Sequence, residues 1–409
     1  MDTLQDPNPI ERQLVQKANE AKIPISATLE LTPVCNLHCD MCYIRMNAAQ
    51  AQQLGGVKTV EEWLSIAIQL KEQGTLFLLL TGGEPLLYPS FQELYVSLKQ
   101  MGFVLTLNTN ATLITEEIAR LFKQYPPRFI KVTLYGGSND TYQSLCHTSK
   151  GWDRCIAGLK LLKQYGIATK LTLTLIEKNR KDYHRMMEIA HELELPTMLN
   201  AYTSMYTRKS CASCIQMADL RMSPEKAARL EIDYQKDTKG EDFENYKLEM
   251  AHFLKQSLTS VPDGLSLTCR AGKSSCWINW QGIMTPCVDM DEPSASVNDL
   301  PVAEAWQHIV QKCQELPSHL ECKGCTLKQV CDVCYANATN EKQKNGNLDY
   351  LCRMAKAKEK LYLQYPHALH HRPHHPIHPR TDRNGDTSQY PEIHHGGKGS
   401  RYTLYVPYC

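Results

Sequence analysis

The stretch Ala27-Thr-Leu-Glu-Leu31-Thr-Pro-Val-Cys35-Asn-Leu-His-Cys39-Asp-Met-Cys42 decides the fold class of this 409-residue chain. Its first five residues predict a short strand, and three cysteines follow on one tight loop at the end of that strand. Such a loop can wrap one corner of a cubane iron-sulfur cluster, and a four-iron cluster with three cysteine ligands leaves one iron open. Zinc is the alternative, with His38 as a fourth ligand, but structural zinc normally takes four ligands in two pairs. The spacing therefore favours an iron-sulfur cluster on Cys35, Cys39 and Cys42.

The sequence around this loop predicts a parallel sheet. From Ile25 to about Ala201, short apolar runs alternate with longer amphipathic ones, which is typical of an α/β fold. Thr59 and Glu62 form a capping box that opens the clearest of the expected helices. Six strand-helix units predict a partial (β/α)6 barrel, with its chemistry at the carboxyl ends of the strands. The expected strands are Ala27–Leu31, Leu76–Leu80, Val104–Leu107, Phe129–Leu134, Lys170–Leu175 and Pro196–Ala201.

The composition favours a globular protein that binds its partners through local sites and not through a large net charge. Lys plus Arg number 45 against 44 Asp plus Glu, so no bulk charge favours nucleic acid or an anionic membrane. The first six residues carry neither a basic region nor an apolar stretch, and the apolar run Leu76–Leu80 is too short to span a bilayer. We therefore expect a cytoplasmic protein without nucleic-acid or membrane partners. In a reducing compartment, its 17 cysteines indicate metal ligands or catalysts rather than disulfides.

A second motif, Thr81-Gly82-Gly83-Glu84-Pro85, follows the second expected strand. Its glycines let the backbone approach a ligand closely, and Glu84 offers an acceptor for a cationic amine. Together, this motif and Cys35-x3-Cys39-x2-Cys42 followed by Tyr43 resemble the signature of radical S-adenosylmethionine (radical SAM) enzymes. The resemblance implies that the open iron of a [4Fe-4S] cluster binds the amino and carboxylate groups of SAM. It also implies that one electron splits SAM to a 5'-deoxyadenosyl radical, which takes a hydrogen atom from substrate.

The same resemblance implies which residues contact SAM. Asn108-Thr109-Asn110 is similar to the family's Thr-Asn-Gly stretch, with Ala111 where glycine is usual. Thr133 stands where related enzymes contact the SAM ribose or carboxylate, although a threonine that pairs across the sheet is the alternative. The expected SAM-binding residues are Gly82, Gly83, Glu84, Pro85, Thr109, Asn110 and Thr133.

Cysteines are dense again from Leu265 to Cys352, where regular periodicity fades, as in a small domain organised by metal. Gly282-Ile-Met-Thr-Pro-Cys287 and Cys322-x2-Cys325-x5-Cys331-x2-Cys334-x17-Cys352 resemble the SPASM extension of radical SAM enzymes, which usually has one residue more between Cys331 and Cys334. The resemblance implies two auxiliary [4Fe-4S] clusters with four cysteine ligands each, in electron-transfer or structural roles. Two zinc sites are the alternative. The implied ligands are Cys269, Cys276, Cys287 and Cys334 for one cluster, and Cys322, Cys325, Cys331 and Cys352 for the other.

These patterns predict five regions along the chain. After about Ala201 the strand pattern stops, and Ser223-Pro224 opens a helix. After Tyr365 the composition becomes rich in His, Pro and Arg, which is typical of disorder. The expected regions are an N-terminal helix or arm (1–25), a radical SAM core (26–222), a helical bridge (223–260), a SPASM domain with two auxiliary clusters (261–360) and a disordered tail (361–409).

The SPASM resemblance implies a peptide or protein substrate, and the chain is most similar to maturases of ribosomally made peptides (RiPPs). We expect hydrogen abstraction from a side chain or α-carbon, followed by a thioether or carbon-carbon crosslink or a related change such as inversion of a stereocentre. An electron donor such as flavodoxin or ferredoxin is implied. About 25 residues precede the first strand, too few for a fused peptide-recognition domain, so a separate protein or the second domain is expected to recognise a leader peptide.

Other functions stay open at this point. Asp289 is placed like the proton-accepting aspartate of related anaerobic sulfatase-maturating enzymes, which favours formylglycine formation, although a solvated loop carboxylate is the alternative. An iron-sulfur electron carrier or scaffold without SAM chemistry is a third hypothesis, and Gly82–Pro85 argues against it. We interpret Cys211 and Cys214 as a surface thiol pair rather than a substrate or metal site. The tail cysteine, Cys409, is interpreted as incidental rather than as part of a fused peptide substrate.

Overall fold

The computed structural model describes residues 9–44, 46–206, 217–255, 264–331 and 333–364. The strands are β1 (Ser26–Glu30), β2 (Phe77–Thr81), β3 (Val104–Thr109), β4 (Phe129–Leu134), β5 (Thr169–Thr174), β6 (Thr197–Asn200), β7 (Ser275–Ile278), β8 (Ile283–Thr285) and β9 (Ala295–Ser296). They form one curved sheet of order β6-β5-β4-β3-β2-β1-β7-β8-β9. The strands from β6 to β7 are parallel to their neighbours, and β8 and β9 pair antiparallel.

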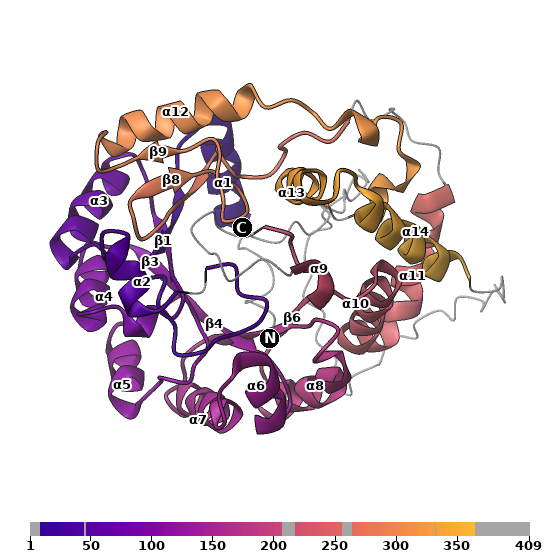
Figure 1. The fold of residues 1–409 in the computed structure, drawn as a ribbon, viewed down its shortest axis with the longest axis horizontal. Helices are drawn as coiled ribbons and strands as arrows, with labels where there is room; N and C mark the ends of the chain where they lie inside the picture. The colour runs from indigo at the N-terminus through magenta and orange to yellow at the C-terminus, as the bar shows by residue number, and fades with distance from the viewer. Residues whose placement is uncertain (1–8, 45, 207–216, 256–263, 332, 365–409) are drawn as a thin grey trace, which may run out of the picture.

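Helices wrap the convex side of this sheet (Figure 1). The α-helices are α1 (Pro9–Ala21), α2 (Ala48–Gln53), α3 (Val60–Glu72), α4 (Phe91–Gln100), α5 (Glu116–Gln124), α6 (Asn139–Cys146), α7 (Gly151–Gln164), α8 (Tyr183–Glu192), α9 (Met217–Leu220), α10 (Pro224–Lys239), α11 (Phe243–Lys255), α12 (Val302–Gln314), α13 (Tyr335–Asn345) and α14 (Asp349–Leu363). Short 3₁₀ helices are η1 (Pro85–Leu87), η2 (Arg180–Asp182), η3 (Gly240–Asp242), η4 (Leu320–Cys322) and η5 (Thr326–Gln329). Within the described residues, no helix is both long enough and apolar enough to cross a membrane.

The six strands expected from the alternating pattern are present, in the expected order and within two residues of the expected ends. The expected capping box is confirmed as well, because Thr59 and Glu62 each accept a hydrogen bond from the other's backbone N–H. Along β3, β4 and β5 every second side chain is fully buried against the helices, while the alternate side chains are half-buried on the inner face. This inner face is the concave side of a partial barrel.

The cysteine-rich segment extends the sheet, which its sequence did not predict. β7 pairs in parallel with β1, and this register sets Cys276 beside Ala27. The indole of Trp277 donates a hydrogen bond of 3.1 Å to the buried carboxylate of Glu30. The strands β7, β8 and β9 have four, three and two residues, so they are too short for an alternating pattern to show.

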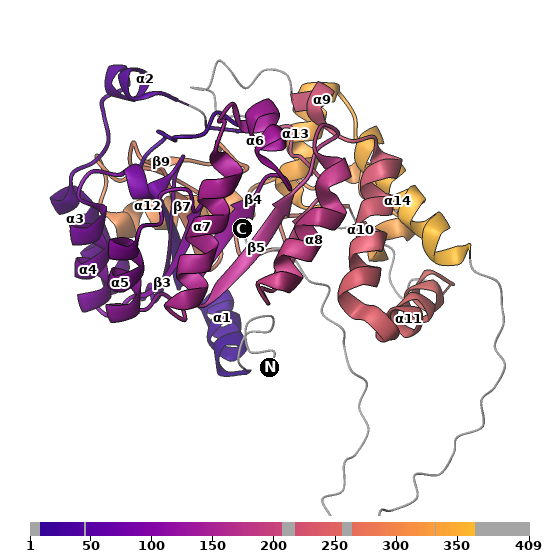
Figure 2. The same ribbon diagram turned by 90° about the horizontal axis from the view of Figure 1, so that it is seen from below.

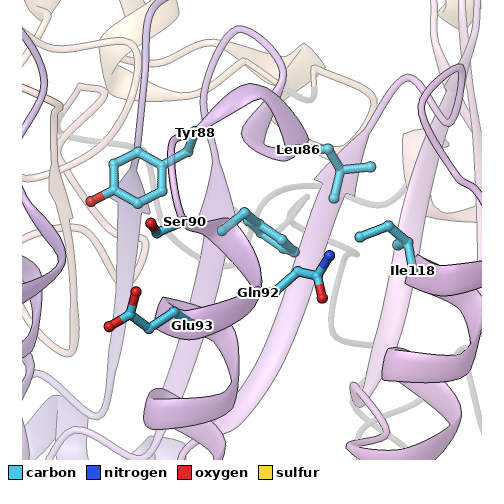
Figure 3. A pocket seen from close by; sticks show the side chains of 7 residues that line it. Leu86, Tyr88, Ser90, Gln92, Glu93 and Ile118 are labelled. Atoms are coloured by element: carbon cyan, nitrogen blue, oxygen red, sulfur yellow. The ribbon is translucent and has the colours of Figure 1, made fainter.

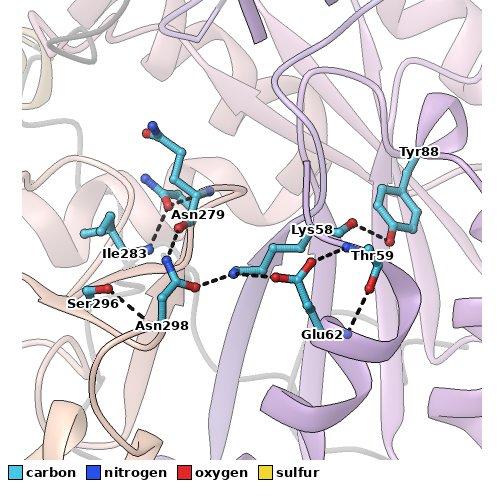
Figure 4. Close-up of polar contacts among 9 residues, drawn as sticks. Lys58, Thr59, Glu62, Tyr88, Asn279, Ile283, Ser296 and Asn298 are labelled. Carbon is cyan, nitrogen blue, oxygen red and sulfur yellow. Dashed lines mark hydrogen bonds and ion pairs between the residues drawn. The ribbon is translucent and has the colours of Figure 1, made fainter. Parts of the chain in front are cut away.

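Lys58 fastens the extension to the barrel (Figure 4). Its buried ammonium group contacts the side-chain oxygen of Asn298 and lies 3.7 Å from the carboxylate of Glu62. The amide of Asn298 donates onward to the carbonyl of Gln281 at 2.8 Å, and the hydroxyl of Tyr88 donates to the carbonyl of Lys58 at 2.8 Å. The buried ammonium of Lys58 therefore holds the start of α3 and the β8–β9 hairpin together.

Helix α1 lies at the end of the barrel opposite the cysteine loop, where the strands begin (Figure 2). Glu11 of α1 forms an ion pair of 2.7 Å with Arg128, the residue before β4. The indole of Trp306 in α12 donates to the carbonyl of Lys22, just after α1. The expected N-terminal helix thus closes the lower end of the sheet.

Candidate active site

The first cysteine loop is tied to the end of the neighbouring strand. After β1, the backbone N–H of Leu31 donates to the carbonyl of Thr81 at the end of β2. The N–H of Gly83 then donates to Thr32 at 2.7 Å, and the N–H of Glu84 donates to Val34 at 2.9 Å. The two sequence motifs therefore continue the β1–β2 ladder past the sheet, and they set Cys35 directly after the last of these bonds.

The glycines of the second motif are required by this close approach of two backbones. A Cβ at Gly82 would lie 2.4 Å from the carbonyl oxygen of Thr32. A Cβ at Gly83 would lie 2.5 Å from the oxygen of Val34 and 2.7 Å from that of Pro33. The glycines therefore admit the segment that leads into the cysteine loop, and their approach to a ligand stays a prediction.

Helix α6 holds the other side of the loop. The backbone N–H groups of His38 and Asp40 donate at 3.0 Å to the last carbonyls of α6, those of Cys146 and Leu145. The carboxylate of Asp40 lies 2.7 Å from the His147 ring and 2.9 Å from the Lys178 ammonium. Burial opposes ionisation of Asp40, but the hydrogen bonds to His147 and Lys178 outweigh it and lower the pKa of Asp40. The sequence pattern contained no signal for this anchor beyond the presence of an acid inside the loop.

Lys178→Met is expected to loosen this anchor. Lys178 also donates to the carbonyl of Ser144 at 2.6 Å, so the change removes two bonds that hold the loop against α6. A half-exposed pair of this kind contributes up to about 1 kcal/mol, so a chelator should extract the loop's iron about fivefold faster. The control is Lys163→Met, which breaks an exposed pair with Glu194 on another face. Equal rates of iron loss in the two variants would show that Lys178 does not hold the loop.

The three thiols of the loop differ in burial and in hydrogen bonding. Cys39 is buried, and Cys35 and Cys42 are half-buried. The sulfur of Cys35 accepts hydrogen bonds from the backbone N–H of Leu37 at 3.4 Å and from the side-chain amide of Asn110 at 3.7 Å. Burial raises the pKa of the Cys35 thiol, so a nearby positive charge such as iron is needed to form the thiolate that binds metal. The three thiols share one loop, but among the described residues no group of three or more metal-binding side chains is gathered around a common point. Ligation of a cluster by Cys35, Cys39 and Cys42 stays a prediction.

Two residues next to the loop were not anticipated. A hydrogen bond with the buried thiol of Cys146, followed by burial, raises the pKa of Cys39, whereas the hydroxyl of Tyr135 lowers it. Tyr135 follows β4, and Cys146 ends α6. Only the fold brings them to Cys39, because more than 90 residues separate each of them from it along the chain.

The predicted SAM-binding residues gather at the same edge of the sheet. Glu84 is fully buried, and its oxygens accept hydrogen bonds from the Thr109 hydroxyl at 2.7 Å, the Asn110 N–H at 2.8 Å and the Leu86 N–H at 3.2 Å. Burial raises the pKa of Glu84 to about 7, against these three bonds, which lower it. Glu84 and Thr109 thus join the ends of β2 and β3. Thr133 lies half-buried on the inner face of β4. Contact of Gly82, Gly83, Glu84, Pro85, Thr109, Asn110 and Thr133 with SAM stays a prediction.

The later cysteines form two groups. Cys269, Cys287 and Cys334 pack in one apolar cluster with Tyr335 and Met290, while Cys276 lies in the main core on β7. In the second group, burial raises the pKa of Cys322, and the neighbouring Cys352 and Cys325 raise it further. Cys331 follows η5, which begins after Cys325. The contacts thus group Cys269 with Cys287 and Cys334, and Cys322 with Cys325 and Cys352. The two ligand sets that the resemblance implies stay a prediction.

Comparison with known proteins identifies the first of these sites. Residues 29–190 match the model of the Radical SAM superfamily, and they contain both motifs. Residues 29–190 therefore form a radical SAM domain. Enzymes of this superfamily use a [4Fe-4S] cluster and SAM. We predict that the cysteine loop holds the cluster and that the Gly-Gly-Glu-Pro turn lies beside SAM.

Curated relatives of the enzyme fall into two branches. The AdoMet-dependent heme synthase of Methanosarcina barkeri is 22% identical over 76% of this chain and 90% of its own length. The subtilosin biosynthesis protein AlbA of Bacillus subtilis is 28% identical over 43% of this chain and 39% of its own length. The sequence identity to AlbA is therefore higher, but the aligned part covers less than half of either protein.

Solved structures share the fold. Streptococcus suis SuiB bound to its precursor peptide SuiA superposes with a TM-score of 0.58 and 16% identity, over 84% of this chain and 81% of SuiB. The chain anSMEcpe with bound AdoMet superposes with a TM-score of 0.61 and 18% identity, over 83% of this chain and 96% of anSMEcpe. These likenesses show the fold, an α/β core with a parallel sheet followed by a cysteine-rich region.

Asp289 lies beside a buried polar network between the barrel and α13. Its carbonyl accepts a hydrogen bond from Asn340, and its carboxylate contributes, after burial and Glu341, to a raised pKa of the Tyr202 hydroxyl. Tyr202, which follows β6, donates to Glu341 at 3.0 Å. Asp289 therefore lies near Tyr202, just after the end of β6, and a catalytic role for it stays a prediction. Cys211 and Cys214 lie outside the described residues, as does Cys409.

The same network contains a buried ion pair. Arg221 contacts Glu341, with both side chains at most 6% exposed, and its guanidinium carbon lies 3.9 Å from the ring centroid of Tyr350 in α14. This pair connects the segment before α10 to α13 and α14.

Arg221→Met is expected to lower the free energy of unfolding by about 3 kcal/mol, because it leaves the carboxylate of Glu341 buried without its cation. Denaturant unfolding of the anaerobic protein measures this change. The matched control is Arg185→Met, which breaks exposed pairs with Glu188 and Glu192 and should cost under about 1 kcal/mol. Equal losses in the two variants would contradict the structural role of the buried pair.

A surface hollow on the helical side lies apart from these sites (Figure 3). It is bounded by η1, the start of α4 and α5, with Leu86, Tyr88, Phe91 and Ile118 among its lining residues. None of the cysteines or predicted SAM-binding residues lines it. Its walls hold Ser90, Gln92 and Glu93 but no metal-binding thiol, so we assign it no part in the chemistry.

Proposed function

We propose that this enzyme modifies a peptide by radical chemistry, forming a thioether or carbon-carbon crosslink or a related change. The observation that carries the proposal is the pairing of β7 with β1, which builds the cysteine-rich region directly onto the radical SAM sheet. The register of this pairing places Cys276 beside Ala27 of β1. Two enzymes of this fold have been solved with peptides, SuiB with SuiA and anSMEcpe with the Kp18Cys peptide, and AlbA is a biosynthesis protein for a bacteriocin.

The roles of the residues follow from their placement. We assign Cys35, Cys39 and Cys42 to a [4Fe-4S] cluster, which together with SAM supplies a 5'-deoxyadenosyl radical. Gly82, Gly83 and Glu84 fix the turn beside this loop, and Asn110 donates to the sulfur of Cys35. We assign the two later sets of four cysteines to auxiliary clusters and Asp289 to proton acceptance. An outside electron donor and a separate leader-recognition protein complete the proposal.

One experiment separates peptide modification from the alternatives. Reduced, anaerobically reconstituted enzyme is incubated with SAM and a short peptide encoded beside its gene. We expect 5'-deoxyadenosine and a peptide lighter by two hydrogen atoms. A different result would support sulfatase maturation: 5'-deoxyadenosine forms, the encoded peptide stays unchanged, and a sulfatase peptide gains formylglycine. Our proposal of peptide crosslinking would then be wrong. If no 5'-deoxyadenosine forms under any condition, the protein does not cleave SAM, and the hypothesis of an electron carrier or scaffold is favoured instead.

A second candidate function is a reaction on a tetrapyrrole. It is favoured by the alignment with the heme synthase, which spans 90% of that protein, whereas the alignment with AlbA spans 39% of AlbA. Another relative is named Fe-coproporphyrin III synthase, so iron coproporphyrin is a suitable probe. Its conversion in the assay above, without any change in the peptide, would establish this candidate instead.

A further inference from the structure

Helix α12 carries a cysteine that none of the roles above uses. The helix packs over β8 and β9 (Figure 1), and Cys313 lies in its last turn, half-buried at the edge of the main core. A Cβ on Gly272 would lie 2.4 Å from the sulfur of Cys313 and 3.8 Å from Ile309, which is one turn earlier on the same face of α12. The sulfur of Cys313 therefore lies against the backbone of Gly272.

Gly272 belongs to a tight turn that begins directly after Cys269. The N–H of Ser275 donates to the carbonyl of Arg270 at 3.1 Å, and the N–H of Gly272 donates to the carbonyl of Ser275 at 3.1 Å. Gly272 has a φ of +64°, so this position favours glycine for its backbone as well as for the space that the sulfur of Cys313 occupies. The turn thus places Cys313 beside a residue that is only three positions from Cys269.

Cys313 has two electrostatic neighbours in the first group of later cysteines. Burial, and then the charge of Cys269, raise the pKa of Cys313 to about 12, against Lys273, which lowers it. Cys313 in turn contributes, after burial, to a raised pKa of Tyr335, the residue that follows Cys334. Because charges interact measurably only over short distances, Cys313 lies near both ends of this group.

Cys276, the fourth member that the resemblance implies for this group, has different surroundings. It pairs with Ala27 of β1, which is buried in the main core on the helix side. The next residue, Trp277, reaches the carboxylate of Glu30 instead, and side chains alternate along a strand, so Cys276 faces the helices. Within the part of the chain that the structure describes, burial is the one cause that raises the pKa of Cys276. Cys276 is therefore fixed in the core by the strand ladder and turned away from the inner face.

We propose that Cys313, in place of Cys276, is the fourth cysteine ligand of the auxiliary [4Fe-4S] cluster whose other ligands are Cys269, Cys287 and Cys334. Each of these thiols would release its proton on binding iron, because the thiolate is the form that binds metal. Cys313 lies outside both spaced cysteine motifs, so only the fold brings it to this group. The inference rests on the auxiliary clusters of the proposed function and changes one ligand of one of them.

The test uses full-length enzyme without the ligands of the first loop. The triple variant Cys35→Ala/Cys39→Ala/Cys42→Ala, reconstituted anaerobically with iron and sulfide, should bind about eight irons in two auxiliary clusters. In this background, Cys313→Ala and Cys313→Ser should each alter one of the two clusters. Either the iron content falls about twofold with loss of one EPR signal, or the cluster persists with three cysteines. In the second case its open iron binds added cyanide, which shifts the EPR spectrum.

Cys276→Ala is the matched control, because it removes another buried thiol of the same region. It should keep about eight irons and an EPR spectrum that cyanide leaves unchanged. The inference is overturned if the Cys313 variants behave like this control, or if Cys276→Ala loses iron or gains cyanide binding. In both cases the auxiliary clusters of the proposed function remain. A triple variant that binds no iron would instead refute those clusters together with the inference.

Discussion

Cys35→Ala is expected to abolish the formation of 5'-deoxyadenosine while the protein keeps about two thirds of its iron, because two of three four-iron clusters have their ligands elsewhere. Cys35 is the first thiol after β1, and it is the sulfur to which Leu37 and Asn110 donate. Without it, two thiols remain on the loop. The iron content and the deoxyadenosine yield of the reconstituted protein measure the two effects independently.

The matched control is Cys155→Ala. Cys155 is fully buried in α7 within the main core, and it belongs to none of the three proposed ligand sets. This variant should keep its full iron content and its SAM cleavage. If Cys35→Ala still cleaved SAM, or if Cys155→Ala lost iron to the same extent, the assignment of the reactive centre to the first loop would be wrong.

The sequence predicted those parts of the fold that depend on local pattern. The strands β1 to β6 alternate with amphipathic helices long enough to show a period, and Thr59 with Glu62 marks a helix start through bonds three residues apart. The cysteine loop and the Gly-Gly-Glu-Pro turn were recognisable because a cluster and its cofactor require fixed residues at fixed spacing. Such features depend only on residues that are close together in the sequence.

The parts that were missed depend on contacts between distant positions. The pairing of β7 with β1 joins residues almost 250 positions apart, and a four-residue strand carries too little pattern to reveal it. The contacts of Asp40 with His147 and Lys178 likewise depend on the fold. The pairing of Lys131 in β4 with Lys170 in β5 likewise depends on the strand register, which cannot be predicted from either lysine alone.

The glycine motif shows how the structure changes the reason for a correctly recognised pattern. A glycine before an acidic residue can serve a ligand, a turn or a backbone contact, and the sequence does not distinguish among them. In the structure, Gly83 lies against the backbone of the segment that leads to Cys35. The residue is therefore important to the cluster loop even though it binds no metal.

Gly83→Ala is accordingly expected to reduce SAM cleavage by about 100-fold, the effect of misplacing reacting groups by roughly 1 Å. The new Cβ would lie 2.5 Å from the oxygen of Val34 and 2.7 Å from that of Pro33. Both contacts are with backbone atoms, so the loop itself must shift to relieve them. The rate of deoxyadenosine formation should fall by this factor, and the iron content shows whether the first cluster is displaced or lost.

Gly102→Ala provides the control for the loss of a glycine as such. Gly102 follows α4 with a φ of +90° and has no atom within 4 Å of the position where a Cβ would lie. Alanine there strains the backbone by about 1 kcal/mol and should lower stability without slowing SAM cleavage. If Gly83→Ala were as active as Gly102→Ala, the contact with Val34 would not position the loop. In that case the glycines would have to be explained by the approach of SAM.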